Sequence, residues 1–356
     1  MRAGFALLLS LVWLAPAWSA EVDSFTGRKP LRDAAPLLDQ VVNVWLEEAL
    51  IEANRKPLLP TLSAPGQACD SARLIDAVKS RFAGYLVGQL ETFANESTAV
   101  DKIRVRFEDS IYRDFDFTES PAVTLTGRLA VLLRVGDQYV GSDKLGHFFT
   151  EGYRYYELYL RSGEAAAIDY GRLTEISFYG LLTTGIFSWA DLAANLNGMR
   201  FWNALLGLRP DPLTQRTVVP MAVCEQGKWK RQRDFRWSDY VDDAWDEAVN
   251  CVAFRDRGLL DKAGALIRAR SGGRDCPLRP AKREALQRKY GRLLEFIFNT
   301  GGNRVLPESL KPDLERYWQQ LMLQIAPLSG LQPEPAAGLP GLGVGVSSSL
   351  YPGHRS

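Results

Sequence analysis

The sequence predicts a mainly α protein: a multi-helix bundle with a minor β-hairpin or meander around residues 103–140. Apolar residues recur at helical spacing along most of the chain, which is the first observation behind this prediction. The second is that β-branched and aliphatic runs are concentrated at 103–107 and 122–140, where Gly136 and Asp137 offer a turn.

The expected helices have recognisable ends. A Pro-rich break separates the first two helices, which we expect at 31–54 and 71–95. Gly163 and Gly207 lie where later helices should stop. The remaining helices are expected at 142–161, 164–185, 189–206, 237–256, 258–270, 280–299 and 308–325.

Residues 1–20 have the features of a secretory signal peptide: a basic residue, a short apolar run and small residues at the cleavage point. Cleavage is expected after Ser19 or Ala20, so the mature protein should be periplasmic or secreted and should not span a membrane. We expect residues 21–327 to form a single, predominantly helical domain. The Pro-, Gly- and Ser-rich residues 328–356 are expected to be a disordered tail.

The charge balance and the histidine count exclude several classes of function. The 356-residue chain has 43 Lys and Arg against 42 Asp and Glu, a formal charge of +1. Nucleic-acid binding relies on a basic excess that neutralises phosphates, so no nucleic-acid partner is expected. Of two histidines, His354 lies in the expected tail. A site that needs several histidines is therefore excluded, and any histidine chemistry depends on His147.

Four cysteines after a signal peptide predict two disulfides, because secreted proteins fold in an oxidising compartment and these spacings match no zinc module. Four cysteines allow three connectivities. We favour Cys251–Cys276, because a helix-turn-helix between these residues could bring them together. This choice leaves the pair Cys69–Cys224.

Polar residues form a stripe on the first helix after the β segment. Four side chains share one side of this helix: Lys144, His147, Glu151 and Tyr155. The other faces are apolar or aromatic, so the helix should be buried and the stripe should face other polar groups. The simplest structural explanation is a network of salt bridges and hydrogen bonds that fixes helix packing, which would account for Asp143 and Lys144.

The following helix supplies partners for this stripe. Four of its residues share a face: Arg172, Glu175, Tyr179 and Thr183. If the two helices form an antiparallel hairpin, Glu151 and Glu175 lie about 12 residues on either side of the turn and could meet at the same level.

A third polar segment begins the helix expected at 189–206. It contains Ser188, Asp191, Asn195 and Gly198. Ser188 and Asp191 are also typical of a helix N-terminus, where the serine hydroxyl caps the first turn. Asn195 is harder to explain in this way, because a buried amide without partners is costly.

These residues, in this order, resemble a group of bacterial envelope proteins of the VanZ-type or small-lipoprotein kind. The resemblance covers residues 139–205 and rests on Asp143-Lys144-Leu145-Gly146-His147, Glu175, Ser188, Asp191, Asn195 and Gly198. VanZ-type proteins are embedded in the membrane, whereas the helices here carry too many polar residues to span one. The resemblance implies a shared helical site.

A fainter resemblance is to periplasmic lysozyme-like enzymes that cut deacetylated peptidoglycan. It rests on the signal peptide, the glutamate-bearing helical core and the aromatic residues. We therefore predict a peptidoglycan-active glycoside hydrolase with peptidoglycan or another envelope glycan as its partner and no cofactor. The expected catalytic residues are Glu175 as general acid, Glu151 as base or stabiliser, and His147. The expected substrate-binding residues are Tyr155, Tyr179, Asp191, Asn195 and Trp189.

Two alternatives stay open. His147 could bind a metal ion together with carboxylates from Asp143, Glu175 or Asp191, although no spacing requires one and no metal is expected. The other alternative is a non-enzymatic helical envelope scaffold or partner-binding protein, in which the polar residues form a buried structural network.

Overall fold

The structure of the protein is a computed structural model that describes residues 21–55, 69–83, 88–177 and 180–307. All of these residues belong to one unit of the chain. Four features expected from the sequence lie outside the described residues: the signal peptide (1–20), the helix at 308–325, the tail (328–356) and Tyr179.

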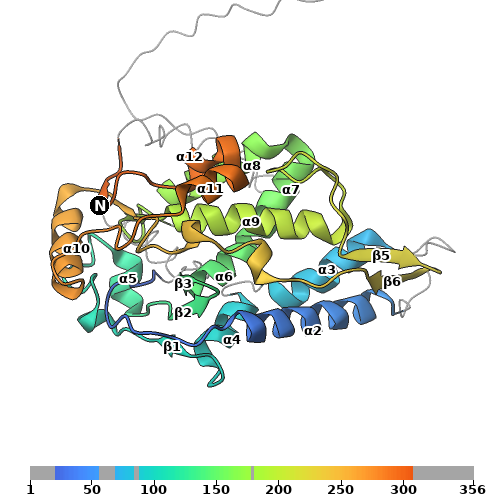
Figure 1. Cartoon of the computed structure of the whole chain (residues 1–356), viewed down its shortest axis with the longest axis horizontal. Coiled ribbons are helices and arrows are strands. Elements are labelled where there is room, and N and C mark those ends of the chain that lie inside the picture. Colours follow the sequence, from blue (N-terminus) through green and yellow to red (C-terminus); the bar gives the residue numbers. More distant parts are fainter. Residues whose placement is uncertain (1–20, 56–68, 84–87, 178–179, 308–356) are drawn as a thin grey trace, which may run out of the picture. The chain divides into compact units, whose positions relative to one another are not determined.

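Helix α9 (Trp189–Leu206) lies in the middle of the fold (Figure 1). It begins at Ser188, whose hydroxyl accepts a hydrogen bond from the backbone of Asp191, and it ends at Gly207, which has a φ of 63°. Of its 18 residues, 16 are buried. A helix that is buried on every side must carry apolar or paired residues all round. Helices that precede α9 and helices that follow it in the sequence pack against it.

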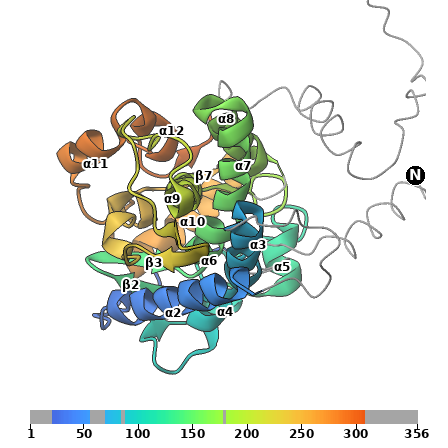
Figure 2. The same ribbon diagram turned by 90° about the vertical axis from the view of Figure 1, so that its right-hand side faces the viewer.

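The segment that precedes α9 forms a pair of neighbouring helices. Helix α6 (Asp143–Gly146), a π-helix (His147–Glu151) and α7 (Gly152–Ser162) continue into one another, as predicted for 142–161. After Gly163, helix α8 (Glu164–Ile176) returns beside α7, and both contact α9 (Figure 2).

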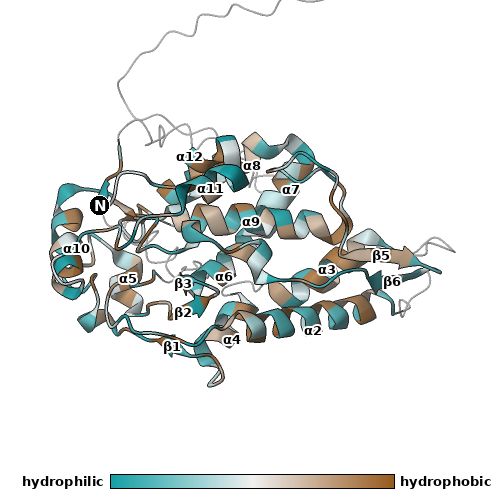
Figure 3. Ribbon diagram, viewed as in Figure 1, coloured by the Kyte–Doolittle hydropathy of each residue, from teal (hydrophilic) through white to brown (hydrophobic). Residues whose placement is uncertain are grey.

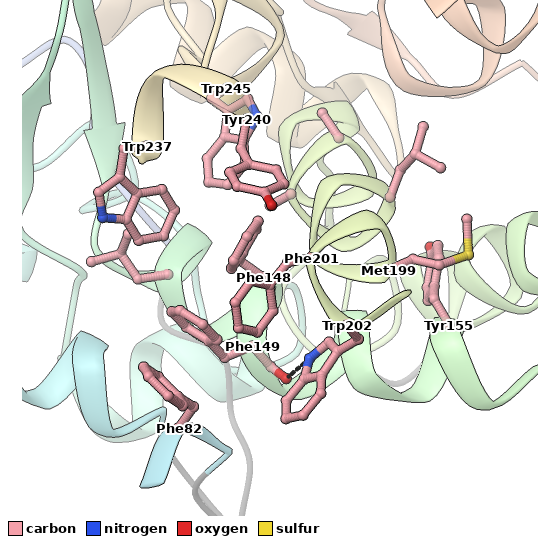
Figure 4. Packing of buried hydrophobic residues seen from close by; sticks show 14 of the residues in the cluster. Phe82, Phe148, Phe149, Tyr155, Met199, Phe201, Trp202, Trp237, Tyr240 and Trp245 are labelled. Carbon is pink, nitrogen blue, oxygen red and sulfur yellow. Dashed lines mark hydrogen bonds between the residues drawn. The ribbon is translucent and has the colours of Figure 1, made fainter. Parts of the chain in front are cut away.

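Helices α7 and α9 approach each other closely at two glycines. A Cβ atom at Gly152 would lie 2.6 Å from the Cα of Gly198, and one at Gly198 would lie 1.9 Å from the carbonyl oxygen of Phe148. The Trp202 indole N–H donates to the Phe149 carbonyl at 2.9 Å beside this crossing (Figure 4). Larger side chains at the two glycines would therefore separate the helices.

Aromatic rings fill the space between α9, the π-helix and the chain after residue 235 (Figure 4). The ring of Phe148 lies at their centre, with ring centroids 4.8 Å from Phe149, 5.0 Å from Trp237 and 5.1 Å from Tyr240. The pairs with Phe149 and Tyr240 are edge-to-face, and such pairs contribute about 0.5–1.5 kcal/mol beyond their burial.

The N-terminal part of the fold is helical. Helix α2 (Ala35–Ala53) buries one face and exposes the other, so hydrophilic and hydrophobic residues alternate along it in Figure 3. The helix predicted at 71–95 is two helices, α3 (Ser71–Phe82) and α4 (Gln89–Glu96). Helix α3 ends because Ala83 has an extended backbone, with φ −89° and ψ 97°.

The predicted β meander is present as an antiparallel sheet in the order β1-β2-β3. Its strands are β1 (Lys102–Ile103), β2 (Leu132–Val135) and β3 (Gln138–Gly141). Gly136, with a φ of 61°, lies in the turn between β2 and β3, as the sequence predicted.

One part of the predicted β region is wrong. Residues Pro121–Thr126 form a short helix, α5. Pro121 suits the first turn of a helix because no N–H is needed there, and Gly127 ends the helix with a φ of 58°. The Thr124 and Thr126 hydroxyls also donate to backbone carbonyls one turn earlier. These local signals outweigh the β preference of the aliphatic residues.

The second half of the chain adds two small β elements. Strand β7 (Ala253–Phe254) pairs antiparallel with β4 (Ile186–Phe187) and parallel with β8 (Arg304–Val305). Strands β5 (Ala222–Glu225) and β6 (Lys228–Arg231) form a hairpin that the sequence analysis did not predict.

The prediction of a helix at 237–256 is wrong. In place of an α-helix, that range contains two short 3₁₀ turns, η4 (Trp237–Asp239) and η5 (Asp243–Trp245), followed by strand β7. The Asp242 carboxylate accepts the backbone N–H of Ala244, and Asp246 accepts that of Ala248. Aspartate side chains that bond nearby backbone N–H groups favour turns over helices.

Two other predicted helices are shorter than expected. Helix α8 ends at Ile176 and not at residue 185, because the chain turns back so that the Leu181 N–H donates to the Glu175 carbonyl at 3.0 Å. The helix predicted at 280–299 is divided at Gly291, which has a φ of 53°. Its parts are α11 (Arg283–Tyr290), η6 (Gly291–Leu293) and α12 (Leu294–Ile297).

Helix α10 (Arg257–Arg270) agrees with the prediction for 258–270, and a short turn, η2 (Phe107–Asp109), completes the described elements. The mainly α class is confirmed in the described residues. None of the helices among them is both long and apolar enough to cross a membrane.

Both predicted disulfides are confirmed. Cys69–Cys224 joins residues 155 positions apart and attaches the β5–β6 hairpin to the start of α3, and Cys251–Cys276 encloses α10. Two disulfides fit a secreted or periplasmic protein.

The crossing of α7 and α9 makes a testable prediction. Gly198→Ala should destabilise the protein by about 1–3 kcal/mol, because the added methyl group overlaps the Phe148 carbonyl. Urea unfolding measures this change. Gly264→Ala in α10 is the matched control, since the nearest atom to its Cβ is the flexible end of Arg268 at 3.6 Å, and it should be neutral or slightly stabilising. Equal effects of the two substitutions would contradict the close crossing.

Candidate functional site

Polar side chains from five segments meet in the interior, and we call this group the buried network. None of its members exposes more than 6% of its surface. They are Glu21, Asp143, Lys144, His147, Glu175, Ser188, Asp191, Asn195 and Glu247.

The ammonium group of Lys144 lies at the centre of the network. Its Nζ atom is 2.6 Å from Asp143 Oδ2, 2.7 Å from Asp191 Oδ1 and 2.7 Å from Glu247 Oε1. Burial alone would lower the pKa of Lys144, but these three carboxylates raise it well above its ordinary value. The ammonium therefore stays charged and joins α6, α9 and the loop after η5.

The same three carboxylates are close enough to bind a metal ion. Oxygen atoms of Asp143, Asp191 and Glu247 all lie within 4.8 Å of one another. Lys144 Nζ contacts an oxygen of each, so the ammonium supplies the positive charge that such a cluster requires. The arrangement is that of a buried ion cluster built around a lysine.

Ser188 connects the carboxylates of the network. Its hydroxyl donates to Glu247 Oε1 at 2.7 Å, and its backbone N–H donates to Glu175 Oε1 at 2.8 Å. The same hydroxyl oxygen accepts the Asp191 N–H at 3.2 Å. The cap of α9 thus also fixes two glutamates from other segments.

His147 and Asn195 extend the network along α9. With its amide nitrogen toward the ring, Asn195 donates to His147 Nδ1 at 3.1 Å and to the Asp191 carbonyl at 3.3 Å. His147 Nε2 lies 3.3 Å from Asp191 Oδ2 and is then the nitrogen that carries the proton. In this orientation the amide oxygen of Asn195 lies 3.4 Å from the Tyr155 hydroxyl. The predicted stripe on 142–161 therefore does meet polar groups of α9.

The two predicted catalytic glutamates lie in different surroundings. Burial raises the pKa of Glu175 well above its ordinary value, and the charge of Asp191 raises it further. Burial also raises the pKa of Glu151, whose Oε2 atom has no hydrogen-bond partner among the described residues. Within those residues no hydrogen bond or ion pair joins the two carboxyl groups, so the predicted meeting across the helix pair is not a direct contact.

The pKa of Asp191 is shifted in the opposite direction to that of Glu175. Burial would raise the pKa of Asp191, but the neighbouring His147 and Lys144 outweigh burial and lower it. Asp191 therefore favours its ionised form, whereas Glu175 favours its protonated form.

The predicted substrate-binding residue Trp189 is buried, 3% exposed, and the centroid of its ring lies 4.7 Å from that of Phe187. Tyr155 is also buried, and its hydroxyl occupies the space that a side chain at Gly171 would need. A cavity of about 490 Å³ lies elsewhere, among α2, the β2–β3 turn, the chain around Trp237 and α11. None of the residues that line this cavity belongs to the buried network.

Sequence reasoning missed three acids that lie in or beside the network. Glu21 and Glu247 are members of the network, and Glu91 on α4 lies beside it. A Cβ at Gly146 would lie 2.4 Å from Glu91 Oε2, so Gly146 has no side chain because the Glu91 carboxyl fills that position. A glycine within a buried helix was a signal that another group approaches there, but it does not identify the group.

Acidic groups outnumber basic groups in this interior. Six buried carboxyl groups face two basic side chains, Lys144 and His147. The acids are Glu21, Glu91, Asp143, Glu175, Asp191 and Glu247. An ionised carboxylate without a partner is very costly to bury, so part of this group must hold protons.

Comparison with models of protein families, with curated proteins and with solved structures found no match to the chain. The two family resemblances drawn from the sequence therefore stay predictions.

The excess of buried acids predicts that stability falls as pH rises. Burial, together with the charge of Asp143, raises the pKa of Glu91 to about 8, and burial raises that of Glu247 to about 7 despite Lys144. Between pH 5 and pH 8 the folded state holds protons that the unfolded chain releases. The melting temperature should therefore be highest near pH 5 and decline through pH 8.

Glu91→Gln tests the source of this decline, because glutamine is uncharged at every pH. The variant should lose less stability than the native protein between pH 7 and pH 8.5. Glu284→Gln is the control, since Glu284 is 94% exposed and should leave the pH profile unchanged. A native profile that is flat or rises over pH 5–8 would contradict the prediction.

Proposed function

We propose that the protein is a non-enzymatic scaffold or partner-binding protein of the bacterial envelope, in which the buried network fixes the packing of a helical bundle. The observation that carries this proposal is the burial of the network. Lys144 is 0% exposed and is paired with three carboxylates, and Glu175 and His147 are 2% and 4% exposed.

Burial of this degree suits a structural role better than a catalytic one. A general acid that cleaves a glycan must touch the glycosidic oxygen, so its carboxyl group has to be reachable from a groove. Glu175 instead accepts the Ser188 N–H and shares the interior with Asp191. The periplasmic location follows from the expected signal peptide and agrees with the two disulfides.

A glycoside hydrolase that acts on peptidoglycan is the second candidate. One observation favours it: the pKa of Glu175 is raised while that of Asp191 is lowered. Two carboxyl groups with opposite shifts are what a lysozyme-like mechanism uses, one as proton donor and one as nucleophile or stabilising charge.

A peptidoglycan assay separates the two candidates. The mature protein is incubated with native and with deacetylated peptidoglycan, and soluble muropeptides are measured. The scaffold proposal expects no release above that of heat-inactivated protein. Release that disappears in Glu175→Gln, with the melting temperature retained, would overturn it in favour of the hydrolase.

The structural role also predicts a stability effect. Asp191→Asn removes one carboxylate from Lys144 and should destabilise the protein by about 3–5 kcal/mol, as expected when one partner of a buried ion pair is removed. Urea unfolding gives this value. Asp261→Asn is the control, because Asp261 pairs with Arg257 on the exposed side of α10 and should change stability by less than about 1 kcal/mol. Similar effects at both positions would argue against the structural role.

A further inference from the structure

The cavity of about 490 Å³ is formed by four segments that are far apart in the sequence. It lies between the start of α2, the β2–β3 turn, the chain from Trp237 to Asp243, and α11. Its volume is within the range of about 300–1,000 Å³ that is typical of ligand pockets. The residues that line it take no part in the buried network, so the structural role of that network does not explain the cavity.

Hydrogen bonds between these segments hold the walls of the cavity in place. Asp33, just before α2, accepts the Gly136 N–H of the β2–β3 turn through its Oδ1 atom at 2.8 Å. Asp243 Oδ2 accepts the N–H of Lys282, the residue before α11, at 2.5 Å. The cavity is therefore preformed, and a ligand that enters it does not have to order its walls.

The floor of the cavity is apolar. Val135, Trp237 and Leu286 line it, and each exposes no more than 2% of its surface. Ala285 lines the same cavity on its exposed side. An apolar side chain of a ligand would be removed from water at this floor, which favours binding.

Trp237 also brings an unpaired donor to the floor. Its ring packs against Phe148 and Phe235, with ring centroids 5.0 Å apart in each pair. Figure 4 shows the indole nitrogen on the edge of the ring that is turned away from Phe148. Nε1 has no hydrogen-bond partner within the described residues, although Trp237 is fully buried. Because an unsatisfied buried N–H is costly, a ligand that brings a carbonyl oxygen to this edge is favoured.

Aspartates surround the mouth of the cavity, which we call the acidic rim. Five aspartates and two lysines line the cavity as a whole. Asp33, Asp137 and Asp239 are the exposed aspartates, and they define the rim. Of these three, Asp137 alone has an ion-pair partner among the described residues, Lys282 at 3.6 Å. The acidic rim thus carries an excess of negative charge that attracts cationic groups.

The aspartates further inside are balanced by the protein itself. Asp242 Oδ2 lies 2.7 Å from Lys289 Nζ, and Asp243 Oδ1 lies 3.0 Å from a guanidinium nitrogen of Arg279. The excess negative charge is therefore at the rim and not at the floor. A ligand that fits this distribution has an apolar part inside the cavity and positive charges around its mouth.

We propose that this cavity is a docking site for a segment of a partner protein that carries one apolar side chain flanked by lysine or arginine residues. The apolar side chain lies against Trp237 and Leu286, and a backbone carbonyl beside it accepts the Trp237 N–H. The flanking cations lie at the acidic rim. An apolar anchor in a pocket with charges around it is the usual arrangement of a protein–protein hot spot.

A peptide segment fits the acidic rim better than a single small amine does. The rim aspartates come from three different segments: the residues before α2, the β2–β3 turn and η4. A ligand that satisfies them needs cations at more than one position. The inference rests on the partner-binding part of the proposed function, and it names the surface and the chemistry of the partner.

Binding of synthetic peptides tests the proposal. The full chain, exported from a Gram-negative host, is titrated into the fluorescently labelled peptide Lys-Lys-Leu-Lys-Lys, and fluorescence anisotropy is measured. One matched peptide has glutamates in place of the lysines, and another has serine in place of the leucine. The leucine peptide with lysines should bind at least about ten-fold more tightly than either of the others, because only it has both the anchor and the cations.

Two substitutions test whether the peptide binds in the cavity. Ala285→Trp fills the cavity from its exposed side and should weaken binding by at least about ten-fold. Asp239→Asn removes one rim charge and should weaken binding by about two- to five-fold, as expected for one exposed charge pair. Asp261→Asn is the matched control, because Asp261 lies on α10 and does not line the cavity, and it should leave binding unchanged. Melting temperatures show that the variants are folded.

Three results would overturn the proposal. Equal binding of the leucine and serine peptides, or binding that Ala285→Trp leaves unchanged, would show a general attraction of cations to the surface. A glucosamine oligomer is titrated as the third arm. If this amino-sugar polymer binds and the leucine peptide does not, the occupant is a glycan and the proposal is wrong.

The peptidoglycan assay on the same preparation separates this inference from the function on which it rests. Release of muropeptides that disappears in Glu175→Gln overturns the proposed function. A lack of peptide binding without such release overturns only the inference about the cavity.

Discussion

The buried ammonium of Lys144 is the interaction on which the rest of the fold depends. It has no exposed surface, and it contacts carboxylates from α6, from α9 and from the loop after η5. Removing an ammonium group from water costs several kcal/mol, and only well-placed carboxylates offset that cost. Because Lys144 lies on α6 beside Asp143, the carboxylates of Asp191 and Glu247 hold α9 and the loop after η5 against α6.

This constraint explains the unusual composition of α9. A helix buried on every side is normally apolar, yet α9 carries Asp191 and Asn195 in its first two turns because these residues bind Lys144 and His147. Further along, Gly198 allows α7 to approach so that the π-helix and α6 stay in register with these partners. Helix α9 is therefore held against the segment 143–162 at two points, by the Lys144–Asp191 ion pair and by the close approach at Gly198.

The sequence could predict much that depends on local signals. Ser188 and Gly207 mark the ends of α9, and the polar stripe with His147 is visible from helical spacing alone. Long-range partners could not be found in this way. Glu247 lies in a segment that we expected to be helical, and it contacts Lys144 only because aspartate-based turns place it there. Glu21 has no local feature that distinguishes it from any acid after a signal peptide.

A double-mutant cycle between Lys144 and Glu247 tests the central claim most directly. Free energies of unfolding are measured for the native protein, Lys144→Met, Glu247→Gln and the double variant. If the buried ammonium organises the fold, the double variant should be more stable than the sum of the single effects predicts, by about 2 kcal/mol or more. Single effects that add to within about 0.5 kcal/mol would show that the two residues are not coupled and would contradict the account.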